Sequence, residues 1–557
     1  MPYNAHMQTI AEELSKIISG DVSIDSNSIT AHSRDKSPIR ITPRIVVFPK
    51  NAADIQSIVE FVGTHKQAHS ELSLTARAGG SDVGGGPLGE SIILSLTKYF
   101  TNLTFTTGHA RVQPGVFYRD FEKKSLEQNL LLPSYPASRS LCALGGMVAN
   151  NAGGEKTLAF GKTDAYVDAL EIVLDDGSLA EIKKLSHEEL AEKCALSNRE
   201  GEIYREISSL VKQNYNTLLG AKPHVSKNSA GYALWNVWDP HTDTFDLTKL
   251  FVGSQGTLGI ITDISLRLIT PQPLSQMLAI FVDDLDQIPR VVKTVLAHKP
   301  EAFEVYDKTV LSIIFTSFFG FIKLMGSTIF KLAIDFIPEF KIILSKRKIP
   351  DYILTAEFTG NNPDEIQKRV SIVATELRAL GIATHMTRGD REIKKYHTIR
   401  RESFSLLQKH HKNRQTITFF DDLIVLPEKL PQFIPALRAI LDSYPSVAYS
   451  IFGHIGDGNF HIIPLMDLTD PRSRETIENL TREINALVLS FQGSITAEHN
   501  DGLVRSPFLK QMYGDDVYAL FEKTKEIFDP KNIFNPGKKV HARLSYALDH
   551  MSATLGK

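Results

Sequence analysis

The stretch SIFGHIGDGNFHIIP, residues 450–464, organises the expected fold. Strand-like residues flank the turn GDGN, whose residues tolerate a positive φ, so the stretch predicts a β-hairpin. If Ile455 pairs with Phe460, His454 and His461 lie opposite each other, with Cβ atoms roughly 5 Å apart. Two imidazoles at that separation can each give one nitrogen to a single metal ion. The alternative is two polar residues on a solvated strand face, but the Glu-His pair at 498–499 favours the metal.

Length and composition limit the class of protein. A chain of 557 residues is too long for one core, so we expect at least two domains. A net charge of −2, from 62 basic and 64 acidic residues, gives no electrostatic reason to expect nucleic acid as a partner. The two cysteines, Cys142 and Cys194, have no metal-ligand spacing and favour a reducing, cytosolic compartment. The beginning, MPYNAH, does not predict a signal peptide.

Three glycine clusters divide the first half of the chain. The first, RAGGSDVGGGPLG at 77–89, has six glycines in thirteen residues and lies between strands expected at 72–75 and 92–96. Its backbone N–H groups can form a nest for a phosphate or pyrophosphate. It matches neither a Walker loop nor GxGxxG before a helix, and the alternative is a flexible surface loop. Further clusters follow at 143–154 and 251–262, where small residues allow the backbone to approach a ligand closely.

The second half predicts alternating strands and helices. We expect strands at 277–281, 353–358 and 417–426, and helices at 288–298, 363–380, 430–443 and 475–491. The apolar segment 311–344 has its longest uncharged run at 309–322, which is shorter than the roughly 20 residues of a bilayer span. We expect two amphipathic helices there. They lie on a membrane interface or a partner, or they form an internal cap, and the sequence leaves these open.

The motifs together resemble one family. The three glycine clusters, GHIGDGNFH, TAEH at 496–499 and FDPKNIFNPGK at 528–538 occur in the order typical of the FAD-linked oxidases of the vanillyl-alcohol oxidase superfamily. The similar branch contains D-lactate dehydrogenase, glycolate oxidase and D-2-hydroxyglutarate dehydrogenase. The resemblance runs from about residue 41 to about residue 540. It implies an α+β fold with a PCMH-type two-subdomain FAD-binding domain, an α+β substrate (cap) domain with an antiparallel sheet, and a C-terminal segment that returns to the FAD domain.

The resemblance also implies domain boundaries. We expect an N-terminal helical segment at 1–36 and the FAD-binding domain at 37–271. The cap domain then spans 272–493 with the apolar insertion 309–344. The C-terminal segment 494–557 carries Glu498 and His499.

The family resemblance assigns FAD contacts to all three glycine clusters and to the C-terminal segment. The first cluster is expected at the pyrophosphate, the second along the ribityl and flavin portion, and the third at the adenine and ribose. The residues implied are Arg77, Ala78, Gly79, Gly80, Ser81, Asp82, Gly85, Pro136, Ser138, Leu144, Gly145, Gly146, Asn150, Asn151, Gly153, Gly161, Gln255, Gly256, Gly259, Ile260, Asn535 and Lys538. Some relatives attach FAD through a histidine in the first loop. This chain has Ser81-Asp82 there, so we expect non-covalent FAD.

The same resemblance implies a metal site and a reaction. His454, His461 and Glu498 match ligands of a divalent metal, zinc by preference with manganese or iron as alternatives. His499 matches the catalytic base. Arg401, with Arg400 as a second choice, matches the residue that pairs with the substrate carboxylate. The expected reaction oxidises a D-2-hydroxy acid: the metal lowers the pKa of the hydroxyl and the hydride passes to flavin N5. Electrons then pass to a quinone or a protein acceptor, with peripheral contact at the inner face of the cell membrane through 309–344.

Departures from the family pattern bear on the substrate. Ile463 stands where the hydroxyglutarate enzymes have a polar residue, and FFDD at 419–422 lacks their basic residue. Both changes favour a small monocarboxylate, with D-lactate, oxidised to pyruvate, as the first choice and glycolate or D-2-hydroxyglutarate as alternatives. Asp501, in place of a small residue, can alter the pocket.

Two other readings remain. The alkyl-dihydroxyacetone-phosphate synthase branch uses FAD without net redox chemistry, but its His-rich run is absent, since His410-His411 is too short. The second alternative is a flavin-bearing electron-transfer or membrane adaptor subunit that has lost the dehydrogenase site. The complete set of His454, His461, Glu498 and His499 argues against it.

Overall fold

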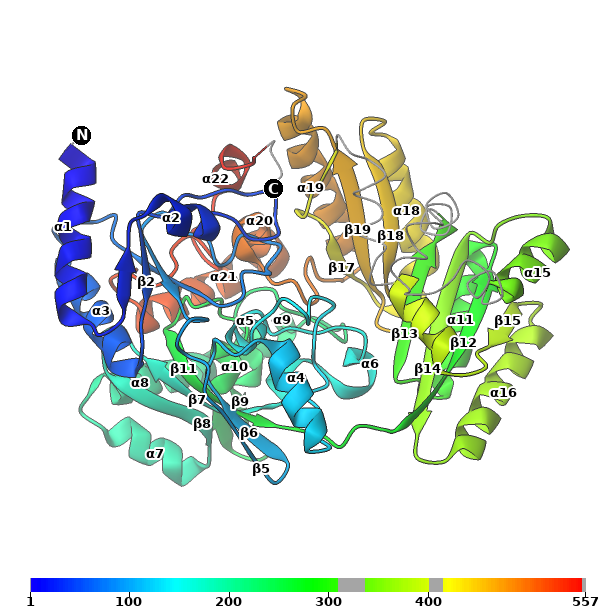
Figure 1. The fold of residues 1–557 in the computed structure, drawn as a ribbon, viewed down its shortest axis with the longest axis horizontal. Coiled ribbons are helices and arrows are strands. Elements are labelled where there is room, and N and C mark those ends of the chain that lie inside the picture. The colour runs from blue at the N-terminus through cyan, green and yellow to red at the C-terminus, as the bar shows by residue number, and fades with distance from the viewer. Residues whose placement is uncertain (1, 309–335, 400–413, 553–557) are drawn as a thin grey trace.

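Three β-sheets with helices packed around them make up the protein (Figure 1). The computed structural model describes residues 2–308, 336–399 and 414–552. Two of the sheets belong to the part of the chain before residue 272, and the third belongs to the part after it. The mixed α and β content and the antiparallel third sheet confirm the expected fold class.

The first sheet is small and mostly parallel. Within the described residues its order is β1-β2-β4-β3, and β2, β4 and β3 are parallel neighbours. Its strands are β1 Asp21–Ser23, β2 Ile45–Phe48, β3 Leu74–Arg77 and β4 Ile92–Ser95. Helix α3 (Ala52–His65) connects β2 to β3 and buries Ile55, Ile58 and Val62 against the sheet. The first glycine cluster therefore starts at the carboxyl end of β3, where open α/β sheets hold their ligands.

The second sheet is antiparallel. The order of its described strands is β5-β6-β11-β7-β8-β10-β9. They are β5 Leu103–Thr106, β6 His109–Val112, β7 Val167–Val173, β8 Leu179–Leu185, β9 Trp238–Asp239, β10 Thr244–Asp246 and β11 Ile260–Arg267. The helices of this half are α1 Pro2–Ile17, α2 Ser26–His32, α4 Tyr118–Glu127, α5 Leu144–Asn150, α6 Thr157–Phe160, α7 His187–Ala195, α8 Arg199–Gln213, α9 Tyr215–Ala221 and α10 Thr248–Phe251, with 3-10 turns η1 Thr163–Ala165 and η2 Leu234–Asn236.

The third sheet carries the hairpin. In the described part of the chain its order is β15-β12-β14-β13-β18-β19-β16, with β17 also paired to β19. Its strands are β12 Leu274–Val282, β13 Ala302–Asp307, β14 Tyr352–Gly360, β15 Ala383–Met386, β16 Gln415–Thr416, β17 Asp422–Ile424, β18 Ala448–His454 and β19 Asn459–Met466. The helices that follow or cover it are α11 Ile288–Ala297, α15 Ile337–Lys346, α16 Pro363–Ala379, α18 Leu430–Asp442 and α19 Ser473–Ser490, with 3-10 turns η3 Leu285–Gln287 and η4 Pro427–Lys429.

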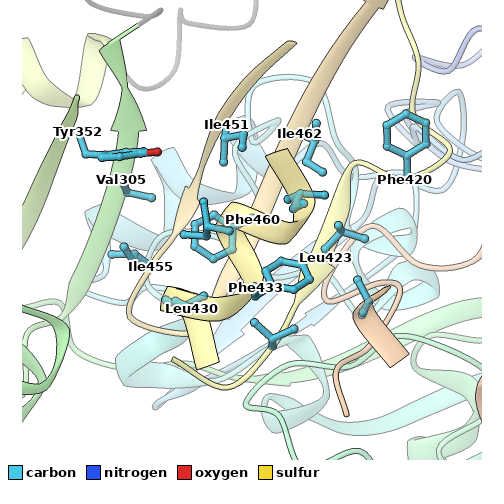
Figure 2. Packing of buried hydrophobic residues seen from close by; sticks show 14 of the residues in the cluster. Val305, Tyr352, Phe420, Leu423, Leu430, Phe433, Ile451, Ile455, Phe460 and Ile462 are labelled. Atoms are coloured by element: carbon cyan, nitrogen blue, oxygen red, sulfur yellow. The ribbon is translucent and has the colours of Figure 1, made fainter. Parts of the chain in front are cut away.

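One face of the hairpin is built into the core of this half. Ile451, Ile455, Phe460 and Ile462 pack with Phe433 of α18 in one apolar cluster (Figure 2). Because side chains alternate along a strand, His454 and His461 must then emerge from the opposite face. The buried face fixes the hairpin, and the fixed hairpin sets the direction of both imidazoles.

The register of the hairpin differs from the expected one. His454 pairs with Asn459 and His461 pairs with Phe452, because the turn comprises residues 455–458 rather than 456–459. The prediction that the two histidines are directly opposite is therefore wrong. They are diagonal neighbours on the same face, since changing the pairing by two residues preserves the face. Their ring centroids are 5.3 Å apart.

The expected strand at 417–426 is also interrupted. Only Gln415–Thr416 and Asp422–Ile424 form strands, and residues 417–421 lie between them outside regular ladder structure. The carboxylates of Asp421 and Asp422 turn there to bind groups of the C-terminal segment. The side-chain contacts thus take precedence over continuous strand pairing.

The C-terminal segment returns to the first sheet, as expected. It contains α20 Gly502–Arg505, the 3-10 turn η5 Ser506–Phe508, α21 Leu509–Phe528 and α22 Leu544–Asp549. Leu74 of β3 donates its N–H to the carbonyl of Ile533 at 2.7 Å and accepts the N–H of Asn535 at 2.8 Å. The boundaries of the domains at single residues remain a prediction.

The apolar insertion is only partly visible. Residues 309–335 lie outside the described residues, and α15 covers the end of the segment. Among the helices that the structure describes, none combines the length and the apolar character that crossing a bilayer requires.

A buried ion pair in α21 gives a stability prediction. Lys525 pairs with Asp529 and also donates to the carbonyls of Thr257 and Phe534. Changing Lys525→Met leaves Asp529 buried without its cation, so we expect a loss of about 3–5 kcal/mol in the free energy of unfolding. Urea unfolding measures it. The matched control is Lys523→Met on the same helix, whose pair with Glu526 is exposed and should contribute about 0–1 kcal/mol. Equal losses in the two variants would contradict the argument.

Candidate active site

A single cavity of about 1040 Å³ connects the glycine clusters with the hairpin. Residues of the first cluster, including Arg77, form one part of its wall, and His454, His461, Glu498 and His499 form another. The second and third clusters lie along it through residues such as Gly146 and Gly256. Segments that are hundreds of residues apart in the sequence thus share one enclosed space.

The first glycine cluster forms an anion cradle. Within the part of the chain that the structure describes, the N–H groups of residues 79–83 have no hydrogen-bond acceptor, and Gly80 has φ +64°. Successive N–H groups that lie along a cavity without a protein acceptor can form a nest for an anion, so these groups suit a ligand with acceptor oxygens. Arg77 supplies a cation beside them: its Nη2 donates to the carbonyl of Arg34 at 2.7 Å, while its buried Nη1 has no partner.

Asp82 holds this loop in shape. Its Oδ2 accepts the N–H groups of Gly84 and Gly86 at 2.9 and 2.8 Å, and its Oδ1 accepts Nδ2 of Asn150 at 2.7 Å. Asp82 lies at the place where some relatives attach FAD through a histidine. Its carboxylate here accepts hydrogen bonds from the protein itself. It also connects the first glycine cluster to the second.

Most of the expected cofactor residues line the cavity. They are Arg77, Ala78, Gly79, Gly80, Ser81, Asp82, Pro136, Ser138, Gly145, Gly146, Asn150, Gly153, Gln255, Gly256 and Gly259. The expected residues that do not line it are Gly85, Leu144, Asn151, Gly161, Ile260, Asn535 and Lys538.

The residues outside the cavity wall pack against or bind other parts of the protein. Leu144 and Ile260 are buried in apolar clusters, and Asn151 caps α5 with φ +49°. Asn535 donates to the carbonyls of Gly86 and Gln255 at 2.9 and 2.7 Å, so it joins two glycine clusters from behind. Lys538 donates to the carbonyl of Leu88 at 2.6 Å, and burial lowers its pKa to about 7.

Gly85 and Gly161 complete this group. The N–H of Gly85 donates to Asp35 at 2.8 Å, and a Cβ there would lie 3.0 Å from Leu503. Gly161 ends α6 with φ +77°. Both glycines set the backbone conformation next to the cavity without lining it. A sequence pattern does not distinguish such a glycine from one that contacts a ligand.

His454, His461 and Glu498 converge. The Nε2 atoms of His454 and His461 lie 3.2 and 3.3 Å from the same oxygen of Glu498, Oε1. Glu304 binds the other nitrogen of His454 at 2.7 Å, which orients that ring. Two imidazole nitrogens and one carboxylate oxygen, buried yet reached from a cavity, are a donor set of the kind that holds catalytic zinc with a position left open. The residues therefore fit the expected divalent metal.

Charges around the cluster keep Glu498 ionised. Burial alone would raise its pKa, but Lys227 and His454 hold the pKa well below its usual range. Burial lowers the pKa of His461, which favours the neutral imidazole. Burial lowers the pKa of His454, but Glu304 and Glu498 together outweigh this effect, and the pKa rises.

Asp422 fixes the segment that carries Glu498 and His499. Its Oδ2 accepts the N–H groups of Ala497, Glu498 and His499, each at 2.8 Å, and the hydroxyl of Thr496 at 2.8 Å. Burial raises its pKa, but His499 and His461 lower it to about 2. The sequence pattern showed only the loss of a basic residue here. The signal that indicates a structural role is an acid inside an apolar strand pattern, which must find donors when it is buried.

His499 is held by a second carboxylate. Its Nδ1 lies 3.2 Å from Oδ2 of Asp421, and Arg505 pairs with the other oxygen of that carboxylate. The His499 ring stacks on His461, with centroids 4.8 Å apart and an interplanar angle of 15°. Burial lowers its pKa, but Asp422 and Asp421 raise it to about 9. With Nδ1 bound to Asp421, Nε2 is the ring nitrogen left for a ligand in the cavity.

One residue singled out in the sequence, Asp501, does not line the cavity, and two others are not among the described residues. Asp501 pairs with Lys539 at 2.7 Å and accepts the N–H of Gly231 at 2.9 Å, and it does not line the cavity. The prediction that Asp501 alters the pocket is wrong, because its carboxylate is turned into the protein. Arg400 and Arg401 lie outside the described residues.

Residues 43–183 match the family described as FAD binding domain. Residues 272–539 match the C-terminal domain of FAD linked oxidases. The chain belongs to the FAD-linked oxidases. The two matches follow each other in the order that the sequence motifs predicted, which confirms the resemblance and the presence of an FAD-binding domain.

Relatives of this chain carry the names of different 2-hydroxy acid enzymes. It is 26% identical to D-2-hydroxyglutarate dehydrogenase of Escherichia coli (strain K12), over 93% of this chain and 50% of that protein. It is 25% identical to glycolate oxidase subunit GlcD of Bacillus subtilis (strain 168), over 95% and 96%. It is 25% identical to D-lactate dehydrogenase of Anaerostipes hadrus, over 89% and 89%. The chain spans about half the length of the Escherichia coli relative.

A solved structure shows the same fold. The chain is similar to 4-ethylphenol oxidase from Gulosibacter chungangensis, with a TM-score of 0.67 and 17% identity, over 97% of this chain and 98% of that one. At this identity the likeness concerns the fold of the chain and not its substrate.

Removing the Asp422 carboxylate should disturb both stability and the cluster. Asp422→Ala leaves three buried N–H groups and a hydroxyl without their acceptor, so we expect a loss of about 3–5 kcal/mol in the free energy of unfolding. After loading with zinc, we also expect less of the metal to remain on dialysis than in the zinc-loaded parent, because Glu498 loses its support. Urea unfolding and elemental analysis check both. The control is Asp549→Ala, at an exposed pair with Arg474, which should change stability by about 0.5 kcal/mol or less. A variant as stable and as zinc-rich as the parent would contradict this role.

Proposed function

We propose that this protein is an FAD- and metal-dependent dehydrogenase of a D-2-hydroxy acid, with D-lactate as the preferred substrate and pyruvate as the product. The observation that carries the proposal is the shared cavity. One wall is an anion cradle suited to a dinucleotide pyrophosphate, and another is a three-ligand cluster beside a histidine. FAD is held non-covalently, since the first loop has no histidine for attachment.

The reaction removes a hydroxyl proton and a C–H hydride. FAD, when bound along the glycine clusters, supplies the hydride acceptor. A divalent cation on His454, His461 and Glu498 supplies Lewis acidity toward the hydroxyl, and its charge favours the neutral, proton-accepting form of His499. His499 takes the proton at Nε2, because Asp421 occupies Nδ1 and fixes the ring.

The wall near the cluster supports a small monocarboxylate. Thr416, Thr418, Phe452 and Ile463 surround that part of the cavity. In the described lining, the lysine and arginine side chains are Arg34, Lys36 and Arg77, and Arg34 and Arg77 lie together at the anion cradle. Among the described residues that line the cavity, a second substrate carboxylate thus has no cation beside the cluster, which favours D-lactate over D-2-hydroxyglutarate. Arg401, or Arg400, is proposed to bind the single carboxylate through a two-pronged contact.

The electron acceptor is proposed to be a quinone or a protein. The feature that supports a membrane quinone is α15, where Ile337, Phe340 and Leu344 are exposed, Leu344 by 77%. These residues belong to the described end of the apolar segment 309–344, and their side chains are open to solvent. Peripheral contact with a membrane through this segment is part of the proposal.

The direct test uses the colour of the flavin. The purified protein should be yellow, and D-lactate should bleach it under anaerobic conditions. Chelator treatment should abolish the bleaching and zinc or manganese should restore it, because the hydroxyl then loses and regains its activation. Absorbance near the flavin maximum follows each step. Bleaching that ignores the chelator would refute the metal role, and bleaching by D-2-hydroxyglutarate or glycolate alone would replace D-lactate as substrate.

His499 can be tested separately from cofactor binding. His499→Ala should stop flavin reduction by D-lactate while the cofactor stays bound, since the residue contributes a proton acceptor and not the anion cradle. Stopped-flow reduction and the flavin-to-protein ratio measure the two effects. His541→Ala, at an exposed pair with Glu522, is the control and should reduce normally. Normal reduction in His499→Ala would assign the base to another residue.

A further inference from the structure

Lys227 is a fully buried cation beside the ligand cluster. Its Nζ lies 3.3 Å from Oε2 of Glu498 and 3.1 Å from Oδ2 of Asp457. Asp457 belongs to the turn of the hairpin that carries His454 and His461. Lys227 therefore bridges the two parts of the chain that supply the cluster, although it comes from a loop between α9 and η2 in the first half.

The neighbours of Lys227 fix its position. Ser226 donates its hydroxyl to Oδ1 of Asp457 at 2.7 Å. Ser229 donates its N–H to the carbonyl of Thr496 at 3.1 Å and its hydroxyl to the carbonyl of Ala497 at 3.0 Å. The loop is thus fastened to the hairpin turn on one side and to the Glu498 segment on the other. The ammonium group has little freedom to leave Glu498.

The two oxygens of Glu498 have different surroundings. Oε1 is the oxygen near both histidines, at 3.2 and 3.3 Å. Oε2 is enclosed by Lys227 and by Gly153, where an added Cβ would lie 3.2 Å from it. Gly153 is one of the glycines that the family resemblance assigns to the flavin. The missing side chain therefore also makes room for this oxygen on the side away from the histidines.

We propose that Lys227 is a positioning residue that keeps Oε2 of Glu498 out of the ligand face, so that Glu498 offers the metal Oε1 alone. This inference rests on the proposed metal site. A carboxylate free to use both oxygens would occupy one more coordination position. Holding Oε2 back leaves that position for the hydroxyl or carboxylate oxygen of the substrate, which must approach from the cavity.

The test uses Co²⁺ in place of the native metal, because its visible absorption depends on the number of ligands. The chelator-treated parent protein is loaded with Co²⁺ and titrated with pyruvate, the expected product. In Lys227→Met we expect weaker visible absorption, because Glu498 then binds through both oxygens, and we expect the response to pyruvate to be lost. The KM for D-lactate should rise about 10- to 100-fold at unchanged FAD content.

The matched control is Lys525→Met, which also removes a buried, ion-paired lysine but touches no ligand. It should keep the parent Co²⁺ spectrum and the pyruvate response even though it is less stable. If Lys227→Met does not fold, Lys227→Ala replaces it, since water can then fill the space between Asp457 and Glu498. The same spectral comparison applies.

The outcomes separate this inference from the proposed function. A parent protein that binds no Co²⁺ at the cluster refutes the metal site, and the role of Lys227 falls with it. A parent that binds Co²⁺ and answers to pyruvate, with Lys227 variants that behave identically, leaves the metal site standing and refutes the positioning role. A changed spectrum in the Lys525→Met control as well would show that lost stability alone moves the signal, and it would overturn the inference too.

Discussion

The buried carboxylate of Asp422 is the constraint on which the site depends. It accepts three successive backbone N–H groups and a hydroxyl from residues 496–499, while its other oxygen accepts Nδ2 of Asn459 at the start of β19. A single anion thus joins the C-terminal segment to the hairpin. Without it, the backbone that carries Glu498 would lose its direct anchor to the hairpin that carries His454 and His461. The low pKa of Asp422 keeps this acceptor charged throughout the ordinary range of pH.

Buried charges connect the remaining parts in a similar way. Lys525 ties the C-terminal segment to the third glycine cluster, and Lys539 ties it to the carbonyls of Ser229 and Gly231. Lys162 donates to the carbonyl of Ala497 at 3.0 Å. Each of these ammonium groups is surrounded mainly by carbonyl or carboxylate oxygens from distant parts of the chain. Because such groups are costly to bury without partners, they specify one arrangement of the segments around the cavity.

The sequence predicted the elements that depend on local patterns. The glycine clusters and the hairpin were recognisable because their turn residues are neighbours in the sequence. The family was recognisable from the order of the motifs along the chain. The face shared by His454 and His461 followed from the period of a strand. The predicted pairing of the two strands was nevertheless shifted by two residues, because the turn begins at Ile455. The family match confirms the fold, while the assigned site residues stay predictions that the geometry supports.

Other features depend on contacts that no local pattern contains. Lys227, Glu304 and Asp422 reach the cluster from three separate elements, and each has an unremarkable sequence neighbourhood. Asn535 and Lys538 stay predicted cofactor contacts, and the structure adds that both side chains donate to backbone carbonyls of the first glycine loop. Spacing alone cannot distinguish a residue that faces a ligand from one that supports the backbone next to it.

Gly153 has a consequence for how this protein can evolve. Its backbone borders the cavity and also lies against Oε2 of Glu498, so one position serves two binding sites. A substitution of Gly153 that alters affinity at the proposed flavin site would also displace Glu498 at the proposed metal site. The two sites are therefore expected to diversify together, with compensating exchanges rather than independent drift.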